Sequence, residues 1–175
     1  MIKRIKTIVE NIWQKIRYPK IRTEGIHYIR IGTEIILIEG GKISIGNKVS
    51  THRRVCFSVI GGQLTIGQKT SFNRNDIIVC RDMITIGKYC SFGPNVCIYD
   101  HDHVFNMSGH EKYTFKTSPI IIEDNCWIGA NAVILRGTHI GEGCVIGAGA
   151  VVKGTIPAHS IVKDGRTLEI EPIKK

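Results

Sequence analysis

The chain has 175 residues, enough for one domain with its own core and too few for two ordinary domains. It carries 24 basic and 15 acidic residues, and its net charge of +9 favours acidic partners. Residues 1–22 hold seven bases and one acid, so the remainder is nearly balanced, which argues against a nucleic-acid-binding protein with a basic stripe.

Residues 1–20 are predicted to form a basic amphipathic helix that ends before Pro19. Apolar residues recur there at spacings of three and four, with bases on the other side. Two interpretations stay open: the apolar stripe packs on protein, or the helix lies on an anionic membrane surface. The segment has no continuous apolar run with a cleavage site, and no run in the chain approaches the ~20 residues of a membrane span. We therefore expect a cytoplasmic protein, with peripheral contact at the inner membrane surface left open.

Residues 25–163 are predicted to form a repeat domain, because aliphatic residues fall on a six-residue step. Glycine often follows the aliphatic residue directly, and a small residue usually stands four positions after the aliphatic. Shorter pieces near Ile43 and Leu64 use the same unit with offsets of two or three residues, which indicate small turn insertions. The frame positions are Ile86, Phe92, Ile98, Ile122, Ile128, Ile134, Ile140, Ile146 and Val152, all aliphatic except Phe92.

A period of six fits neither a helix nor an amphipathic strand. It fits a solenoid with three flat faces and about eighteen residues per coil, in which each face offers one aliphatic side chain to the interior. Cys126 and Cys144 lie eighteen residues apart, so we expect stacked, free core thiols rather than disulfides or a zinc site. Residues 164–175 leave the repeat and are expected to form an extended tail.

The repeat resembles that of the hexapeptide-repeat acyltransferases over residues 30–163. This resemblance implies an all-β fold, a left-handed parallel β-helix, built from hexapeptide units. It also implies an enzyme that uses acetyl-CoA as co-substrate, and a homotrimer with active sites between subunits.

The six-residue frame breaks once, and we expect residues 99–119 to form a loop extruded from a corner of the solenoid. Its root reads IYDHDHVF, which could be a metal site, a proton-transfer site or a solvated loop. We expect His101 and His103 to point to opposite sides of an extended chain, so that they could not share one ion. The metal-binding gamma-class carbonic anhydrases, on the same scaffold, carry histidine where this chain has Arg136. We therefore expect no metal.

The chain is similar to the sugar O-acetyltransferase branch, which includes galactoside, maltose and capsular-polysaccharide acetyltransferases. In that branch the catalytic histidine lies five residues after the last aliphatic before the loop, and an asparagine lies thirty residues upstream. Counting from Ile98 gives His103 and Asn73. The resemblance implies that His103 is the general base for a sugar hydroxyl and that Asn73 binds the acceptor or the reacting group.

The remaining site residues divide into an acceptor group and a cofactor group. Asp100 or Asp102 could orient the imidazole, while His101 and Asn75 are further candidates for binding or orienting the acceptor. The resemblance implies that the backbone N–H of Ala130 stabilises the oxyanion of the tetrahedral intermediate, and that coenzyme A lies along the coil edge. The candidate cofactor residues are Trp127, Ala130, Gly147, Ala148 and Lys153.

The expected activity is acetyl transfer to a sugar hydroxyl, most consistent with a surface or capsular polysaccharide or its precursor. Two alternatives stay open: an N-acetyltransferase of a nucleotide-linked amino sugar, and a non-catalytic solenoid that serves as a scaffold or binding module. The expected partners are a sugar or polysaccharide acceptor and further copies of the chain, without nucleic acid.

Overall fold

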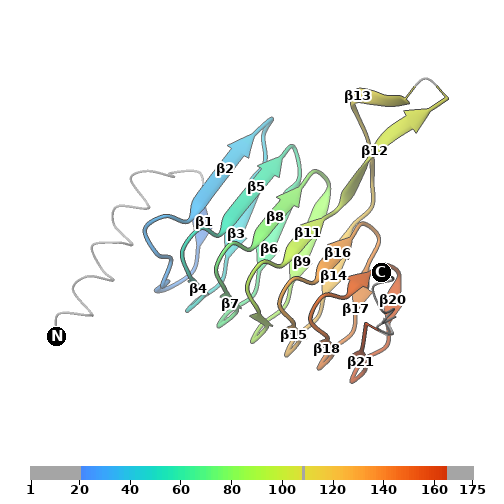
Figure 1. Ribbon diagram of the computed structural model, residues 1–175. Coiled ribbons are helices and arrows are strands. Elements are labelled where there is room, and N and C mark those ends of the chain that lie inside the picture. The colour runs from blue at the N-terminus through green and yellow to red at the C-terminus, as the bar shows by residue number, and fades with distance from the viewer. Residues whose placement is uncertain (1–20, 108, 165–175) are drawn as a thin grey trace, which may run out of the picture.

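The computed structural model describes residues 21–107 and 109–164, and every regular element in these ranges is a β-strand (Figure 1). Three parallel sheets form the sides of a prism, and the chain visits them in turn; we call them faces A, B and C. The helix predicted over 1–20 and the tail beyond residue 164 lie outside the described residues. No helix in the described ranges is long and apolar enough to cross a membrane.

Face A has seven strands and faces B and C have six each. Face A consists of β1 (Arg22–Thr23), β3 (Lys42–Ile45), β6 (Gln63–Ile66), β9 (Met83–Ile86), β14 (Ile120–Ile122), β17 (His139–Ile140) and β20 (Thr155–Ile156). Face B consists of β4 (Ser50–Thr51), β7 (Ser71–Phe72), β10 (Ser91–Phe92), β15 (Trp127–Ile128), β18 (Val145–Ile146) and β21 (Ile161–Val162). Face C consists of β2 (Glu34–Ile38), β5 (Cys56–Ile60), β8 (Ile77–Cys80), β11 (Cys97–Tyr99), β16 (Val133–Leu135) and β19 (Val151–Val152).

The hexapeptide frame predicted the core correctly. Every aliphatic position of the frame is buried, with exposures of 4% or less. Burying an isoleucine side chain contributes roughly 1.5–3 kcal/mol, so stacking of these columns is the main stabilising interaction of the solenoid. The solenoid that the repeat predicts is therefore confirmed.

Coil length changes along the prism. Ile128 pairs with Ile146, eighteen residues on, whereas Ile66 pairs with Ile86 after twenty and Phe57 with Ile78 after twenty-one. The surplus lies between face C and face A, where the early strands are longer and turn later. The two- and three-residue offsets in the sequence are thus explained by wider early coils.

The small residues at the corner between faces A and B also donate hydrogen bonds. Cys90 donates its S–H to the carbonyl of Glu123 at 3.1 Å, and Cys126 donates to that of Gly141 at 3.2 Å. Thr70 and Cys144 make the equivalent contacts with the next coil. All six cysteines are free, and Cys126 and Cys144 are buried in the core as expected.

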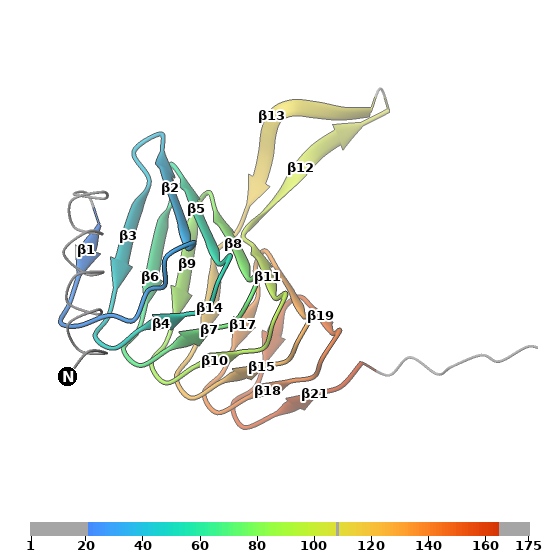
Figure 2. The same cartoon turned by 60° about the vertical axis from the view of Figure 1, so that its left-hand side comes forward.

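The segment extruded from the solenoid is an antiparallel hairpin rather than an irregular loop. It comprises β12 (His101–Asn106) and β13 (Gly109–Thr117), paired from His101 opposite Thr117 outward. Figures 1 and 2 show the hairpin leaving the corner between faces C and A and projecting away from the prism.

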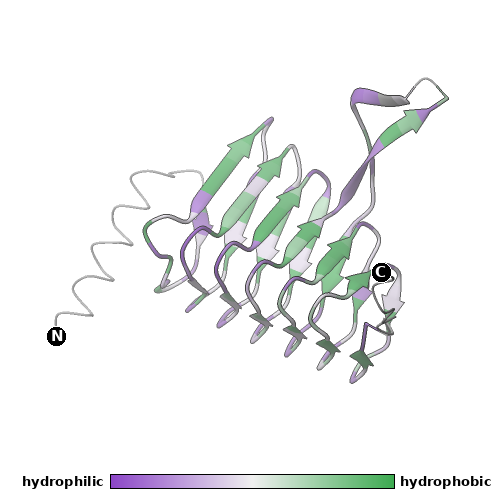
Figure 3. Ribbon diagram, in the orientation of Figure 1, coloured by the Kyte–Doolittle hydropathy of each residue, from purple (hydrophilic) through white to green (hydrophobic). Residues whose placement is uncertain are grey.

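The outer surfaces of the three faces differ chemically. Face A presents polar residues such as Lys42, Gln63 and Thr65, whereas the first half of face B presents serines. Face C is mainly aliphatic on its outside, and Figure 3 shows hydrophobic colour over much of β2, β8 and β16. Its outward aliphatic residues are Ile36, Ile38, Ile60, Ile77, Val79, Val133, Leu135 and Val151.

Candidate active site

The root of the hairpin is fixed by Asp100, whose side chain is fully buried. Its carboxylate accepts the backbone N–H of Arg81 at 2.8 and 3.0 Å and that of Asp82 at 2.8 Å. Its backbone carbonyl accepts the N–H of Ser118, which closes the other end of the hairpin at 2.9 Å. A buried carboxylate that holds several N–H groups is a strong anchor, so the hairpin starts from a defined position.

His101 is the histidine that this carboxylate orients. Its Nδ1 lies 3.2 Å from Oδ1 of Asp100, and only 12% of its side chain is exposed. Its ring meets that of Phe115 edge-on, with centroids 5.4 Å apart. The sequence expectation allowed Asp100 to orient the catalytic imidazole; the contact goes to His101.

His103 lies on the same side of β12 and is exposed to solvent. Its ring is tilted against Phe115, with centroids 4.7 Å apart. Residues two apart on a strand share a face, so the expectation that His101 and His103 point to opposite sides is wrong. Both imidazoles rest on Phe115, the cross-strand partner of His103.

The other side of β12 is tied to the following coil. Asp102 forms an ion pair with Nε of Arg136, from the turn after β16. Asp102 is thereby engaged away from the imidazoles, whereas the sequence had offered it as an orienting group. Arg136, noted in the sequence only as a departure from metal-binding relatives, is a structural clamp of the hairpin.

Arg81 is a part of the site that sequence reasoning missed. Its guanidinium carbon lies 3.6 Å from the centroid of Phe115, a cation–π contact that supports the ring on which the histidines rest. Its Nε is buried, and in the described ranges it has no hydrogen-bond partner. Nothing in the sequence near Arg81 indicates this role, because its contact with β13 bridges 34 residues.

Asn73 lies at another corner, between β7 and β8. Its Oδ1 accepts the N–H of Arg74 at 2.9 Å, and its own N–H donates to Asp76 at 2.7 Å. Asp76 is fully buried and also accepts the N–H of Val96 at 3.0 Å. Burial raises the pKa of Asp76 from 3.8 to about 7, although the two N–H donors act in the opposite direction.

Asn75 belongs to a ladder of asparagines along the same corner. Its Nδ2 donates to Asn95 at 2.9 Å, and Asn95 donates to Asn131 at 3.1 Å. All three have φ near +60°, a conformation that asparagine tolerates better than most residues. The structure thus gives Asn75 a structural contact.

The candidate cofactor residues lie on several parts of the prism. Trp127 is 49% exposed on the outside of face B, and Ala130, Gly147 and Ala148 form the corner between faces B and C. Lys153 lies at the opposite edge of face C. In the described ranges, the N–H groups of Ala130 and Ala148 donate no hydrogen bond to the protein.

One chain alone does not bring the catalytic and cofactor candidates together. The hairpin with His103 leaves the corner between faces C and A, whereas β15 with Trp127 lies on face B (Figures 1 and 2). Within residues 21–107 and 109–164, no cluster of three side chains could hold a metal ion.

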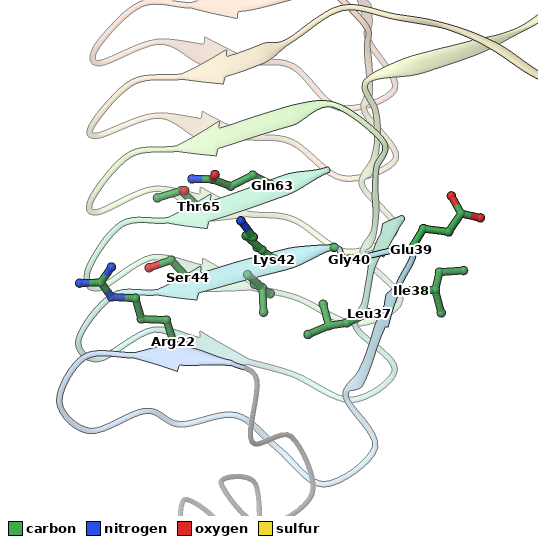
Figure 4. A pocket seen from close by; sticks show the side chains of 11 residues that line it. Arg22, Leu37, Ile38, Glu39, Gly40, Lys42, Ser44, Gln63 and Thr65 are labelled. Carbon is green, nitrogen blue, oxygen red and sulfur yellow. The ribbon is translucent and has the colours of Figure 1, made fainter. Parts of the chain in front are cut away.

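A cavity of about 820 Å³ lies on face A near the first coils (Figure 4). Arg22, Lys42, Gln63 and the turn at Glu39 line it, and none of the predicted site residues does. The cavity adjoins the start of the described chain, well before the coil that carries the hairpin.

Comparison with known proteins agrees with this architecture. Residues 119–153 match the family described as hexapeptide repeat of succinyl-transferase. A probable acetyltransferase of Mycobacterium tuberculosis is 32% identical over 85% of this chain and 52% of its own length. A putative lipopolysaccharide biosynthesis O-acetyl transferase of Escherichia coli is 28% identical over 70% of this chain and 67% of its own length. The chain thus spans about half the length of the mycobacterial relative.

Solved structures share the solenoid. A mutant of AntD, an N-acyltransferase from Bacillus cereus solved with dTDP-4-amino-4,6-dideoxyglucose and coenzyme A, superposes with a TM-score of 0.74. The alignment covers 93% of this chain and 89% of that one at 20% identity, which shows a common fold. The buried six-residue frame and the family match thus agree that the chain contains a hexapeptide repeat, and its relatives include proteins named as acetyltransferases.

Proposed function

We propose that the protein is an O-acetyltransferase that moves an acetyl group from acetyl-CoA to a sugar hydroxyl, with His103 as general base. The observation that carries this proposal is the mounting of an exposed imidazole on a hairpin root fixed by a buried carboxylate and an ion pair. A general base needs such a defined position, because proton transfer requires hydrogen-bond reach to the attacking hydroxyl.

Each residue has a distinct task in this proposal. His103 takes the proton of the sugar hydroxyl, and a positioned base of this kind contributes roughly 10²–10⁴ in rate. Asn73 offers its side-chain amide to the acceptor, and the unused N–H of Ala130 stabilises negative charge on the reacting oxygen.

Bound acetyl-CoA would supply the activated thioester. Trp127, Gly147 and Ala148 would hold it along the prism, with Lys153 of an adjacent copy near its phosphates. The unused N–H groups of Ala130 and Ala148 fit such a ligand, because they offer donors at one corner.

The site is completed by a homotrimer in this proposal. The outer side of face C is aliphatic, and Val151, Ile38 and Ile36 are 60%, 48% and 41% exposed. Both edges of face C carry site candidates, so packing this face against a second copy brings the hairpin of one subunit toward the Ala130 corner of the next. Replacing Ile36 and Ile77 by glutamate should yield monomers in analytical ultracentrifugation, whereas the same charges at Gln63 and Thr85 on face A should not.

The direct test of activity measures release of free coenzyme A with a panel of sugars. We expect acceptor-dependent release by the wild type and a loss of roughly 10²–10⁴ for His103→Ala. His101→Ala is the matched control, because it removes the neighbouring imidazole and should retain more activity. Equal activity of His103→Ala and wild type would contradict the proposal.

An amino-sugar N-acetyltransferase is the second candidate, supported by the likeness of the fold to the AntD N-acyltransferase. The product distinguishes the two activities, because an ester is cleaved by mild base and an amide survives it. A non-catalytic scaffold would release no coenzyme A with any acceptor.

Peripheral membrane contact through residues 1–20 is part of the proposal, since a basic amphipathic segment suits an acceptor at a membrane. Deletion of residues 1–20 should abolish binding to anionic liposomes and spare activity on a soluble sugar. Unchanged liposome binding would contradict this role.

A further inference from the structure

A continuous row of side chains runs across the outer surface of face B. Tyr28 pairs with Ser50, Ser50 with Ser71, Ser71 with Ser91 and Ser91 with Trp127. We call this row the serine strip. Neighbouring strands are about 4.8 Å apart, so the four steps span roughly 19 Å along the prism. The three serines are bracketed by aromatic rings, of which Tyr28 is 47% and Trp127 49% exposed.

Basic residues line both edges of the serine strip. Between Gly40 and Asn75 the sequence has six bases and no acid, and the fold places five of the six at the two corners that flank face B. In the described part of the chain, none of the corner bases forms a salt bridge. Lys88, further along the chain, is a sixth corner base. The corner bases are thus Lys48, Lys69 and Lys88 on one edge and Arg53, Arg54 and Arg74 on the other.

The cationic character ends halfway along the prism. On the corner between faces A and B, Lys48, Lys69 and Lys88 give way to Asp124 and Glu142 in the later coils. An overall charge count conceals this segregation. The basic half coincides with the serines, so a ligand attracted there meets hydroxyl groups and an aromatic ring at each end.

We propose that the serine strip and its basic edges bind an extended acidic glycan that lies along the prism axis. The serine hydroxyls, which lie between two rows of long basic side chains, can exchange hydrogen bonds with sugar hydroxyls. The aromatic rings offer stacking surfaces for the apolar faces of sugar rings. The bases supply charge-assisted hydrogen bonds to carboxylates, repeated at a spacing comparable to the length of one pyranose unit.

The other occupants fit these observations less well. A membrane-binding surface needs apolar side chains that enter the lipid, and the middle of the strip has serines instead. A second copy of the chain would bring six bases that form no salt bridge against six more, whereas the aliphatic face C offers a surface without that repulsion.

The inference rests on the proposed function only for the use of the glycan as acceptor. Binding is measured without acetyl-CoA, so the two claims can fail separately. Intact glycan binding without acetyl transfer would count against the proposed function alone. Acetyl transfer to small sugars without glycan binding would count against the serine strip alone.

The experiment titrates the full chain with oligogalacturonate of about ten units in a calorimeter at low salt. The strip variant Lys48→Asn/Arg53→Gln/Lys69→Asn should bind at least tenfold more weakly than the wild type; asparagine suits the positive φ of the two lysines. The control variant Arg22→Gln/Lys42→Gln/Lys112→Gln removes the same charge from face A and the hairpin and should change affinity less than twofold. Tyr28→Ser, which alters no charge, should weaken binding about threefold.

Several results would overturn the inference. They are no binding of oligogalacturonate, equal losses in the strip and control variants, or equally tight binding of polyglutamate or single-stranded DNA of matched charge. Binding of phosphatidylglycerol vesicles that the strip variant loses, without binding of oligogalacturonate, would assign the face to a membrane instead.

Discussion

Oδ1 of Asp100 lies 3.2 Å from Nδ1 of His101, and this contact distinguishes the two histidines of β12: Asp100 holds His101 and not His103. The buried carboxylate holds His101 at the root of the hairpin and leaves His103 one step further out, in solvent. The histidine with the better-defined carboxylate partner is therefore the one with the more structural position.

Asp100→Ala should destabilise the protein and disorder the hairpin. The substitution leaves the part-buried N–H groups of Arg81 and Asp82 without their acceptor, which costs about 2–4 kcal/mol. Urea unfolding of the variant checks the value. Asp100→Asn should lose less, since its amide oxygen still accepts a hydrogen bond. A free energy of unfolding equal to that of the wild type would refute the anchoring role.

Arg81→Met should lower kcat roughly tenfold while leaving KM for acetyl-CoA unchanged, because the guanidinium supports Phe115 beneath His103. The cation–π contact contributes only about 0.5–2 kcal/mol, so the variant should fold. Arg81→Lys retains the charge and should recover part of the rate. Equal rates for the methionine variant and the wild type would show that the stack plays no part in positioning His103.

Asp76→Asn should flatten the pH dependence of stability. The pKa of Asp76 is raised by burial to about 7 in the folded protein, against 3.8 ordinarily, so the folded state binds the proton more tightly. Its contribution to the free energy of unfolding therefore falls as pH rises from about 4 to about 7 and is constant above that. Urea unfolding at pH 5 and pH 8 should give a smaller difference for Asp76→Asn than for wild type. The control variant Glu39→Gln, at an exposed acid, should behave like the wild type.

Gly87→Ala should force apart two coils at the corner between faces A and B. A Cβ at Gly87 would lie 2.6 Å from the backbone N of Asp124 and 2.6 Å from the carbonyl carbon of Glu123. Such a clash with backbone costs roughly 1–3 kcal/mol. Differential scanning calorimetry should find a clear loss of thermal stability. Gly40→Asn should lower the thermal stability much less, because a Cβ at Gly40 would have no neighbouring atom within 4 Å.

The solenoid was predictable from sequence because its stability comes from repetition. Residues such as Ile128 and Ile146 occupy equivalent positions one coil apart, so a period in the chain becomes a column in the core. The role of the small residue four positions after each aliphatic was predicted only in part, from its size. Cys90 and Cys126 are there for the hydrogen bonds that they donate as well as for their size.

The candidate site was less predictable because its contacts join different coils. The motif at residues 98–105 correctly marked where a segment leaves the solenoid, yet it could not reveal which carboxylate meets which partner. Asp102 meets Arg136, 34 residues away, and Arg81 meets Phe115 across the same distance. The charge of face B was hidden for the same reason, since bases twenty residues apart become neighbours only after stacking.

The hairpin depends on the coil before it being longer than the coils after it. Arg81 and Asp82 form the turn of a twenty-residue coil, and their amide groups are committed to a side chain of the following coil. Shortening that coil to eighteen residues would preserve the six-residue repeat. It would also remove the turn whose amide groups bind the carboxylate of Asp100. The longer coil is thus required to anchor the hairpin. The same hairpin sequence inserted between two coils of eighteen residues would have no turn amides to bind its first carboxylate.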